Sequence, residues 1–265
     1  MKVLVKLGGT LLDIPESRER IATQIAVVAR TVELVVVHGG GKQMTRYLAE
    51  RGIESRFVNG LRVTTPEMVD AVLKVFAGSV NHELVASLNR AGATAVGLSG
   101  IDALLAEAEP MDPALGAVGR VTRSNPALLD LLTSNHFLPV VACVAGDRQG
   151  NVYNVNGDQM AVACAAAFAA QQLVFLTDVE GVLDEARQVR SVLTATESES
   201  LISTGIATGG MQAKLNAALA ALRAGVKQVR IAPGAAPDVL PRILGGEPVG
   251  TRMILNGGNT AISCP

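Results

Sequence analysis

The sequence has no tryptophan, and its 265 residues include only two tyrosines and five phenylalanines. Stacking platforms for single-stranded nucleic acid and cages for quaternary cations both depend on aromatic side chains, so this scarcity argues against both. An excess of either charge is also absent, because 23 Lys and Arg face 24 Asp and Glu, for a net charge of −1. We therefore expect neither a basic nucleic-acid surface nor an acidic tail.

Cysteine occurs only three times, at Cys143, Cys164 and Cys264, and never as a C-x-x-C pair. This pattern indicates neither a disulfide framework nor a zinc cluster. We expect free thiols in a reducing, cytoplasmic environment. A signal peptide is not expected, because the apolar run after Lys2 is broken at Lys6 after three residues.

One stretch without charge has the length of a membrane span: nineteen uncharged residues lie between Asp158 and Asp178. Two glutamines, Gln171 and Gln172, divide it into an Ala-rich segment typical of a helix and a short strand-like run, Leu173–Leu176. We therefore expect no membrane span.

Short apolar runs alternate along the chain with amphipathic segments. Runs that are apolar on both faces are typical of parallel strands buried by helices, so the alternation predicts an α/β fold with binding sites at the strand C-termini. The predicted strands are Val3–Leu7, Leu34–Val37, Ala95–Leu98, Leu138–Val144, Leu173–Leu176, Val229–Ala232 and Met253–Leu255. The predicted helices are Glu16–Arg30, Lys42–Arg51, Pro66–Ala91, Asn125–Asn135, Asp158–Ala170, Met211–Ala224 and Pro237–Leu244, and Asp147–Asn151 is a predicted hairpin turn.

Three glycine-rich turns carry lysines: Lys6–Thr10, His38–Lys42 and Thr208–Lys214. Glycines let backbone N–H groups approach anions closely, and a helix N-terminus favours negative charge. A lysine late in a buried strand, such as Lys6, is costly unless it meets an anion. The turns match neither the Walker A nor the G-x-G-x-x-G pattern. Taken singly, each is also compatible with an ordinary tight turn or a solvated lysine, although the three glycines of His38–Lys42 exceed what a turn needs.

Three further segments are candidates. Arg62, within Asn59–Thr64, is either a bidentate carboxylate clamp or a surface arginine. In Asn154–Asp158 the two asparagines alternate onto one face, while Asp158 is either functional or a helix cap. Asp178–Leu183 forms an acidic turn after a buried strand. We assign structural roles to the three histidines, which are scattered along the chain. Phosphoryl transfer by charge stabilisation is indicated by what remains: two lysines, an aspartate and the glycine turns.

In chain order, seven motifs resemble those of the amino acid kinase family: Lys6–Gly9, Val37–Gly41, Asn59–Thr64, Asn154–Asp158, Asp178–Leu183, Gly210–Lys214 and Gly250–Arg252. The resemblance spans the chain and implies a three-layer αβα sandwich with a mainly parallel central sheet. It implies an acyl-amino-acid-binding lobe at residues 1–171 and a nucleotide-binding lobe at residues 172–265. It also implies transfer of the ATP γ-phosphoryl group to the side-chain carboxylate of N-acetyl-L-glutamate, a step of arginine biosynthesis.

The same resemblance implies residue roles. Lys6 and Lys214 would neutralise the transferring group from opposite sides, and Asp158 would hold both lysines. The substrate would be bound by Gly40, Gly41, Arg62, Asn154 and Asn156, with Arg62 on the α-carboxylate. The ATP phosphates and nucleotide would be bound by Gly8, Gly9, Asp178, Val179, Glu180, Gly181, Val182, Leu183, Ile206, Ala207 and Thr208. Mg²⁺ would be carried by the ATP phosphates, without a metal site made by protein side chains.

The proposed chemistry agrees with the residues present. A carboxylate acceptor is ionised near neutral pH, so it needs positioning and relief of anion repulsion rather than a general base. A hydroxyl acceptor would need a base, for which the sequence offers no clear candidate. Asp158 is therefore interpreted as an organiser of the lysines.

Some positions depart from the family pattern. Gly157 stands where members acting on free acetylglutamate more often have alanine, and Ile101 and Ala103 replace the usual lysine and glycine. Asn156–Gln159 is similar to kinases of carrier-protein-bound aminoadipate or glutamate, so that substrate class is the alternative within the family. A basic rim would favour an acidic carrier, and Arg46, Arg51, Arg56 and Arg62 are candidates for one.

A different class of function, a non-catalytic nucleotide- or anion-binding module, is the remaining alternative. Loss of either lysine or of Asp158 would have signalled it, and all three are present. The first strand is predicted to begin at residue 2 or 3, without the N-terminal helix of arginine-inhibited hexameric members. From this we expect a homodimer without arginine feedback.

Overall fold

The central element is an eight-stranded sheet with the strand order β12-β14-β13-β11-β1-β2-β8-β5. The computed structural model describes residues 1–256. All neighbouring strands pair in parallel except β13 and β14. The strands are β1 (Lys2–Leu7), β2 (Glu33–His38), β5 (Ala95–Ser99), β8 (Leu138–Ala142), β11 (Gln172–Thr177), β12 (Val192–Thr194), β13 (Gln228–Pro233) and β14 (Thr251–Ile254).

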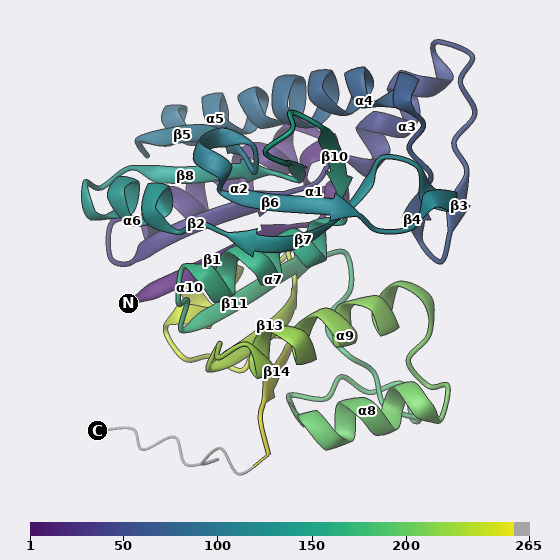
Figure 1. Ribbon diagram of the computed structural model, residues 1–265. Helices are drawn as coiled ribbons and strands as arrows, with labels where there is room; N and C mark the ends of the chain where they lie inside the picture. The colour runs from purple at the N-terminus through teal and green to yellow at the C-terminus, as the bar shows by residue number, and fades with distance from the viewer. Residues whose placement is uncertain (257–265) are drawn as a thin grey trace.

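Helices cover both faces of this sheet, which makes the three layers visible in Figure 1. Successive strand residues point to opposite faces, so Leu4 packs in one hydrophobic cluster and Val3 and Val5 in the other. The first cluster includes α6 (Ala127–Ser134), α7 (Gly157–Ala167), α8 (Ala195–Ser203) and α9 (Gly209–Arg223). The second includes α1 (Gly9–Asp13), α2 (Pro15–Val28), α3 (Gly41–Ala49), α4 (Pro66–Val72), the π-helical η1 (Leu73–Val80), α5 (Asn81–Arg90) and α10 (Val239–Leu244). The predicted fold class is confirmed.

A small closed barrel lies beside the sheet. It contacts α7 through β7 and α4 through β10. Its strands are β6 (Ala106–Pro110), β7 (Val118–Ser124), β9 (Val144–Gly146) and β10 (Val152–Val155). The Asp147–Asn151 turn joins β9 to the antiparallel β10, as predicted. A hairpin of β3 (Phe57–Val58) and β4 (Leu61–Arg62) and two short 3-10 helices, η2 (Asp102–Leu104) and η3 (Pro113–Leu115), complete the described chain.

The uncharged stretch between Asp158 and Asp178 forms most of α7 and then β11, as its division at Gln171 and Gln172 predicts. No helix within residues 1–256 is long and apolar enough to cross a membrane. Cys143 and Cys164 are buried free thiols, as predicted, and burial raises the pKa of each to about 12. Cys264 lies outside the described residues.

The predicted division into lobes at residues 171 and 172 falls between α7 and β11. The sheet itself is continuous there, because β1 pairs with β11 on one side and with β2 on the other. The lobe assignment stays a prediction.

Candidate active site

Three of the sequence motifs meet where neighbouring strands end. Leu7 of β1 pairs with Leu176 of β11 on one side and with His38 of β2 on the other. Because these strands are parallel, the turns that follow them emerge side by side, near α3, β3 and β4 in Figure 1. This is the edge at which open α/β sheets bind ligands.

The glycine turns present three backbone donors there. A Cβ placed on Gly9 would lie 3.6 Å from the nitrogen of Gly41, so the turns after β1 and β2 are in contact. The N–H groups of Gly9, Gly40 and Gly41 have no hydrogen-bond partner in residues 1–256. Gly8 differs, because its N–H donates to the carbonyl oxygen of Leu176 at 2.8 Å. Three adjacent unpaired donors at the starts of α1 and α3 are suited to an anion with several oxygens.

Lys6 of β1, three residues before Gly9 in the chain, forms an ion pair with Asp158 of α7. Lys6 Nζ lies 2.6 Å from Asp158 Oδ1, and each side chain is only 12% exposed. A Cβ on Gly157 would lie 3.2 Å from Lys6 Cε, so glycine allows the lysine to pass close to the start of α7. The pair brings a predicted catalytic lysine and its predicted organiser together across two elements.

The cap of α7 is Asn156, not Asp158. Asn156 Oδ1 accepts hydrogen bonds from the N–H groups of Asp158 at 2.9 Å and Gln159 at 3.2 Å. This leaves the Asp158 carboxylate available to Lys6, and the helix-cap interpretation of Asp158 is wrong. The predicted contact of Asn156 with substrate is not tested by this geometry and stays a prediction.

Lys214 lies in α9, which packs against α7. It is partly exposed, and it has no ion-pair partner within the described part of the chain. The predicted link from Asp158 to Lys214 therefore stays a prediction. An unpaired lysine near a helix N-terminus remains available to an incoming anion.

Arg62 belongs to the β3–β4 hairpin, but its side chain is buried and held by several contacts. It is 7% exposed, and its Nη2 donates to Gly41 O at 2.9 Å and to Thr45 Oγ1 at 2.7 Å. Its Nη1 donates to Ser55 Oγ, and its guanidinium stacks on Phe57 with 4.6 Å to the ring centroid. Burial lowers the pKa of Arg62 from its ordinary value. Sequence reasoning missed these supporting partners.

Asn154 connects the barrel to the same place. Its Nδ2 donates to Thr64 Oγ1 at 2.9 Å, and Thr64 Oγ1 donates to Arg62 O at 3.0 Å. Asn154 and Arg62 are thus brought together from β10 and β4, as the prediction of a shared substrate requires.

The predicted nucleotide residues divide into two segments of the second half. In the first, Asp178 and Glu180 are exposed, Leu183 is 39% exposed, and Val179 is partly buried. Val182 is fully buried, and its N–H donates to Thr251 Oγ1 at 2.8 Å, which involves the Gly250–Arg252 motif. A Cβ on Gly181 would lie 2.8 Å from the same oxygen, so this turn is packed tightly.

The second segment, Ile206–Thr208, leads into α9. Ile206 and Val179 both pack against the first hydrophobic cluster, which places the two segments against a common core. The N–H groups of Gly209 and Gly210 have no partner in residues 1–256. The start of α9 therefore offers further donors to an anion such as a phosphate.

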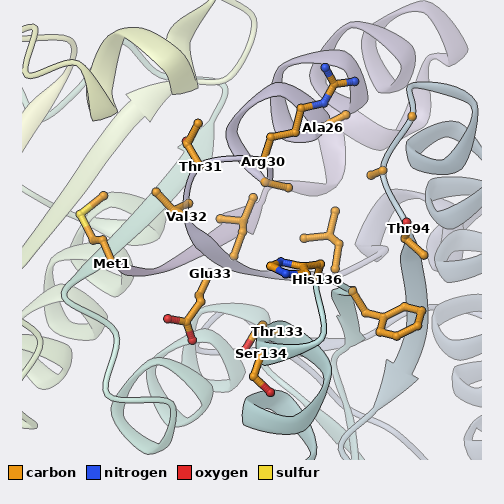
Figure 2. Close-up of a pocket in the computed structure, with 16 residues that line it drawn as sticks. Met1, Ala26, Arg30, Thr31, Val32, Glu33, Thr94, Thr133, Ser134 and His136 are labelled. Atoms are coloured by element: carbon orange, nitrogen blue, oxygen red, sulfur yellow. The ribbon is translucent and has the colours of Figure 1, made fainter.

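A separate hollow of about 660 Å³ lies at the opposite ends of the strands. Figure 2 shows Met1, Glu33, Thr94 and His136 around it, with Arg30 directed away from Glu33. None of the predicted site residues lines this hollow. The convergence of motifs, rather than cavity size, locates the candidate site.

His38 is a buried residue whose contacts the sequence did not predict. It is fully buried at the end of β2, and burial lowers its pKa from 6.5 to about 4. Its Nδ1 lies 2.8 Å from Gly39 O and its Nε2 lies 2.9 Å from Asn81 Nδ2. The imidazole is therefore neutral in the folded protein near pH 7.

This pKa predicts a pH dependence of stability. The unfolded chain binds a proton on His38 below about pH 6.5, whereas the folded chain does so only near pH 4. Stability from this residue is therefore present above pH 6.5 and lost as the pH falls to 4, by about 3 kcal/mol in total. We expect His38→Asn to lose this part of the pH dependence in denaturant titrations between pH 7 and pH 4. The assignment would be contradicted if the free energy of unfolding changed equally with pH in wild type and His38→Asn. It would also be contradicted if His82→Gln, a variant at an exposed site, lost the same part of the pH dependence.

Comparisons with known proteins agree with these motifs. A sequence profile of the amino acid kinase family matches residues 1–233. The chain is 72% identical over 255 residues to the acetylglutamate kinase of Solibacter usitatus (strain Ellin6076), covering 96% of this chain and 99% of that protein. It is 44% identical over 244 residues to the acetylglutamate kinase of Acidobacterium capsulatum, covering 91% and 94%.

Solved structures show the same architecture. N-acetylglutamate synthase from Neisseria gonorrhoeae, complexed with coenzyme A and N-acetyl-glutamate, matches 96% of this chain with a TM-score of 0.86 and 25% identity. The chain spans 59% of that longer protein. Carbamate kinase from Giardia matches 96% of this chain and 98% of its own with a TM-score of 0.73 and 18% identity, which is a likeness of fold.

Proposed function

The chain belongs to the amino acid kinase family, and we propose that it transfers the γ-phosphoryl group of ATP to the side-chain carboxylate of N-acetyl-L-glutamate. The product is N-acetyl-L-glutamyl 5-phosphate, an intermediate of arginine biosynthesis. The observation that carries the reaction type is that three unpaired N–H donors follow the adjacent strands β1 and β2, and that Lys6 of β1 is paired with Asp158. The relatives named acetylglutamate kinase, at 72% and 44% identity, support the substrate.

The reaction requires two anions to approach each other. A side-chain carboxylate oxygen attacks the γ-phosphorus, the bond to the β,γ-bridging oxygen breaks, and ADP leaves. The attacking carboxylate is ionised near neutral pH, so no proton has to be removed. Catalysis then consists of alignment and of stabilising the charge on the transferring group.

The donors described above would supply that stabilisation. In the proposal, Gly9, Gly40 and Gly41 donate N–H groups to the phosphoryl oxygens and the attacking carboxylate. Lys6 approaches the transferring group from the β1 side, held by Asp158. Lys214 approaches from α9, with the N–H groups of Gly209 and Gly210 near the phosphates. Fixed donors of this kind cost little reorganisation during the reaction.

ATP would bind at the second half of the chain. The segments Asp178–Leu183 and Ile206–Thr208 would line the nucleotide, and the exposed start of α9 fits phosphate. Mg²⁺ is part of the proposal as the counterion of ATP, with phosphate oxygens as its main ligands. Within residues 1–256 no group of three or more His, Cys, Asp or Glu side chains is placed to hold a metal ion.

The α-carboxylate of the substrate would bind Arg62, supported by Asn154 and Asn156. We expect Arg62→Ala to raise KM for N-acetyl-L-glutamate by about 10²-fold, because a charge-assisted contact is lost. The kcat should change less than KM, since in the proposal Arg62 binds the α-carboxylate rather than the transferring group. Steady-state kinetics at saturating ATP measure both constants.

Two variants make the Arg62 result specific. Arg62→Lys keeps the charge but loses the planar fork, so its KM should fall between the wild-type and alanine values. Arg56→Ala removes an exposed arginine next to the same hairpin and should leave KM unchanged. An unchanged KM in Arg62→Ala would show that Arg62 is not the clamp.

A carrier-bound aminoadipate or glutamate remains the alternative substrate. Two of the arginines that could form a basic rim are paired, Arg46 with Asp13 at 3.2 Å and Arg51 with Glu50 at 3.8 Å. Arg62 is buried, and its guanidinium is hydrogen-bonded within the protein. The positive charge left to attract an acidic carrier is correspondingly reduced.

The acceptor can be identified by ADP release with MgATP and a panel of acids. The panel contains N-acetyl-L-glutamate, N-succinyl-L-glutamate, N-acetyl-L-aminoadipate and free glutamate. The proposal expects the highest kcat/KM with N-acetyl-L-glutamate. Activity with none of the free acids, although ATP binds, would favour the carrier-bound substrate, and failure to bind ATP would favour a non-catalytic module.

The proposal includes a cytoplasmic homodimer. Light scattering after size-exclusion chromatography should give twice the mass of one chain, and a hexamer would contradict this part.

A further inference from the structure

His38 lies directly before the Gly39–Gly41 turn, and both of its ring nitrogens and its carbonyl oxygen have partners. Nδ1 faces Gly39 O at 2.8 Å, and Nε2 faces Asn81 Nδ2 at 2.9 Å. The thiol of Cys143 donates to His38 O at 2.8 Å. None of the catalytic roles described above uses this buried group.

The partners of Asn81 determine which ring nitrogen carries the proton. Asn81 Nδ2 also lies 2.9 Å from Val140 O, and a carbonyl oxygen can only accept. The atom facing both Val140 and His38 is therefore the amide nitrogen, and Nε2 of His38 must accept. The proton of the neutral ring is then on Nδ1, which donates to Gly39 O.

The residues around the Asn81 side chain come from distant parts of the chain. Asn81 begins α5 directly after the π-helical η1 and is 1% exposed. A Cβ on Gly97 of β5 would lie 2.1 Å from Asn81 Oδ1, so this amide fits only against glycine. The His38–Asn81 contact thus joins β2, α5 and β5.

The Gly39 carbonyl and the Gly40 N–H belong to one peptide unit. In a planar trans peptide the C=O and N–H point in opposite directions, so a bond that fixes Gly39 O also fixes the direction of the Gly40 N–H. Gly40 is buried, and its N–H has no partner in residues 1–256. A Cβ on Gly40 would lie 2.9 Å from Phe76 Cδ1, so η1 packs directly against this turn.

We propose that His38, held as the Nδ1–H tautomer by Asn81, is a positioning residue that aims the Gly40 N–H at the reacting anion. This inference rests on the proposed function for its kinetic consequence, whereas the tautomer is independent of it. His38 does not touch the substrate and transfers no proton. Its effect on the reaction acts through the orientation of one backbone donor.

Two substitutions of His38 distinguish the role of Nδ1 from that of Nε2. The amide of asparagine reaches the place of Nδ1, and that of glutamine reaches the place of Nε2. His38→Gln should lower kcat by about 10²-fold, because a misdirected donor no longer stabilises the transferring charge. His38→Asn can still donate to Gly39 O and should keep kcat within about tenfold of wild type. KM for ATP should stay unchanged in both.

The control is His82→Gln. His82 Nδ1 also lies 2.9 Å from a backbone carbonyl, that of Gly78, but the residue is exposed and makes no hydrogen bond to the Gly39–Gly41 turn within residues 1–256. Its kcat should equal that of wild type. Equal kcat values for His38→Gln and His38→Asn, with wild-type protein active, would overturn the positioning role.

The tautomer can be read without substrate from ¹⁵N-histidine NMR of the wild-type chain, which has three histidines. His38 should show a protonated Nδ1 and an unprotonated Nε2 at pH 7. In Asn81→Asp, whose carboxylate accepts instead of donating, His38 should gain a proton on Nε2. An Nε2–H tautomer or a charged ring in wild type overturns the inference, even if the histidine variants fail to fold.

The two proposals can fail separately. Inactivity of wild-type protein toward N-acetyl-L-glutamate contradicts the proposed function and leaves the NMR result to decide the tautomer. An active wild type with the other tautomer contradicts the inference about His38 alone.

Discussion

Replacing Lys6 with alanine is expected to lower kcat by about 10²–10³-fold, the size of effect seen when a fixed donor to a developing charge is removed. Lys6 lies on β1 shortly before the first glycine turn, and its Nζ is held 2.6 Å from Asp158 Oδ1. The lost interaction acts mainly in the transition state, so the KM values should change less than kcat. Steady-state kinetics with MgATP and N-acetyl-L-glutamate measure this.

Lys2 provides a matched control on the same strand. It pairs with Asp130 at 2.7 Å at the other end of β1, far from the glycine turns. Lys2→Ala should therefore keep kcat near the wild-type value. Lys6→Ala also leaves Asp158 buried without its partner, which destabilises the fold. Thermal melting must show folded protein at the assay temperature, and near-normal turnover of folded Lys6→Ala would contradict the role.

Replacing Lys214 with alanine is expected to lower kcat by a similar factor, about 10²-fold or more. The reason is again the charge on the transferring group, approached here from α9. Unlike Lys6, Lys214 has no ion pair within residues 1–256, so its removal orphans no buried carboxylate. The melting temperature should therefore stay close to wild type while turnover collapses.

Lys227 is the control for Lys214. It is an exposed lysine in the turn that follows α9, at the end away from the glycines. Lys227→Ala should change neither kcat nor stability measurably. If Lys214→Ala keeps more than about a third of the wild-type kcat, phosphoryl stabilisation from α9 is not part of the mechanism.

The central sheet was predictable because its strands are apolar on both faces. Val3–Leu7 and Leu173–Leu176, for example, appear as β1 and β11 within one or two residues. The barrel strands β6 and β7 were not predicted, because their residues alternate with exposed charges such as Glu109 and Arg120, which pair across the strands at 2.7 Å. Such half-exposed strands lack a continuous apolar signal.

Helix α8 was missed although the sequence carried a signal for it. Thr194 and Glu197 form a reciprocal capping box, with Thr194 Oγ1 and the Glu197 carboxylate each bonded to the other's backbone N–H. The T-x-x-E spacing is recognisable in a sequence. The segment was passed over because its few apolar residues give a weak helical period.

The site was predictable as a set of motifs, but its internal contacts were not. The order of strands in the sheet, which places the turns after β11, β1 and β2 together, was not predicted, because local sequence does not determine which strands pair. The contact between His38 and Asn81 joins residues 43 positions apart. Likewise, nothing local decides that Asn156 caps α7 and frees Asp158 for Lys6.

The most direct test of the proposed reaction is chemical trapping of the product. Wild-type protein is incubated with MgATP, N-acetyl-L-glutamate and hydroxylamine, which attacks an acyl phosphate at its acyl carbon and releases phosphate. Mass spectrometry should find the side-chain hydroxamate of N-acetyl-L-glutamate in an amount equal to the ADP formed, and Lys6→Ala should give almost none. ADP without hydroxamate, or no ADP with this acid, would contradict phosphorylation of its side-chain carboxylate.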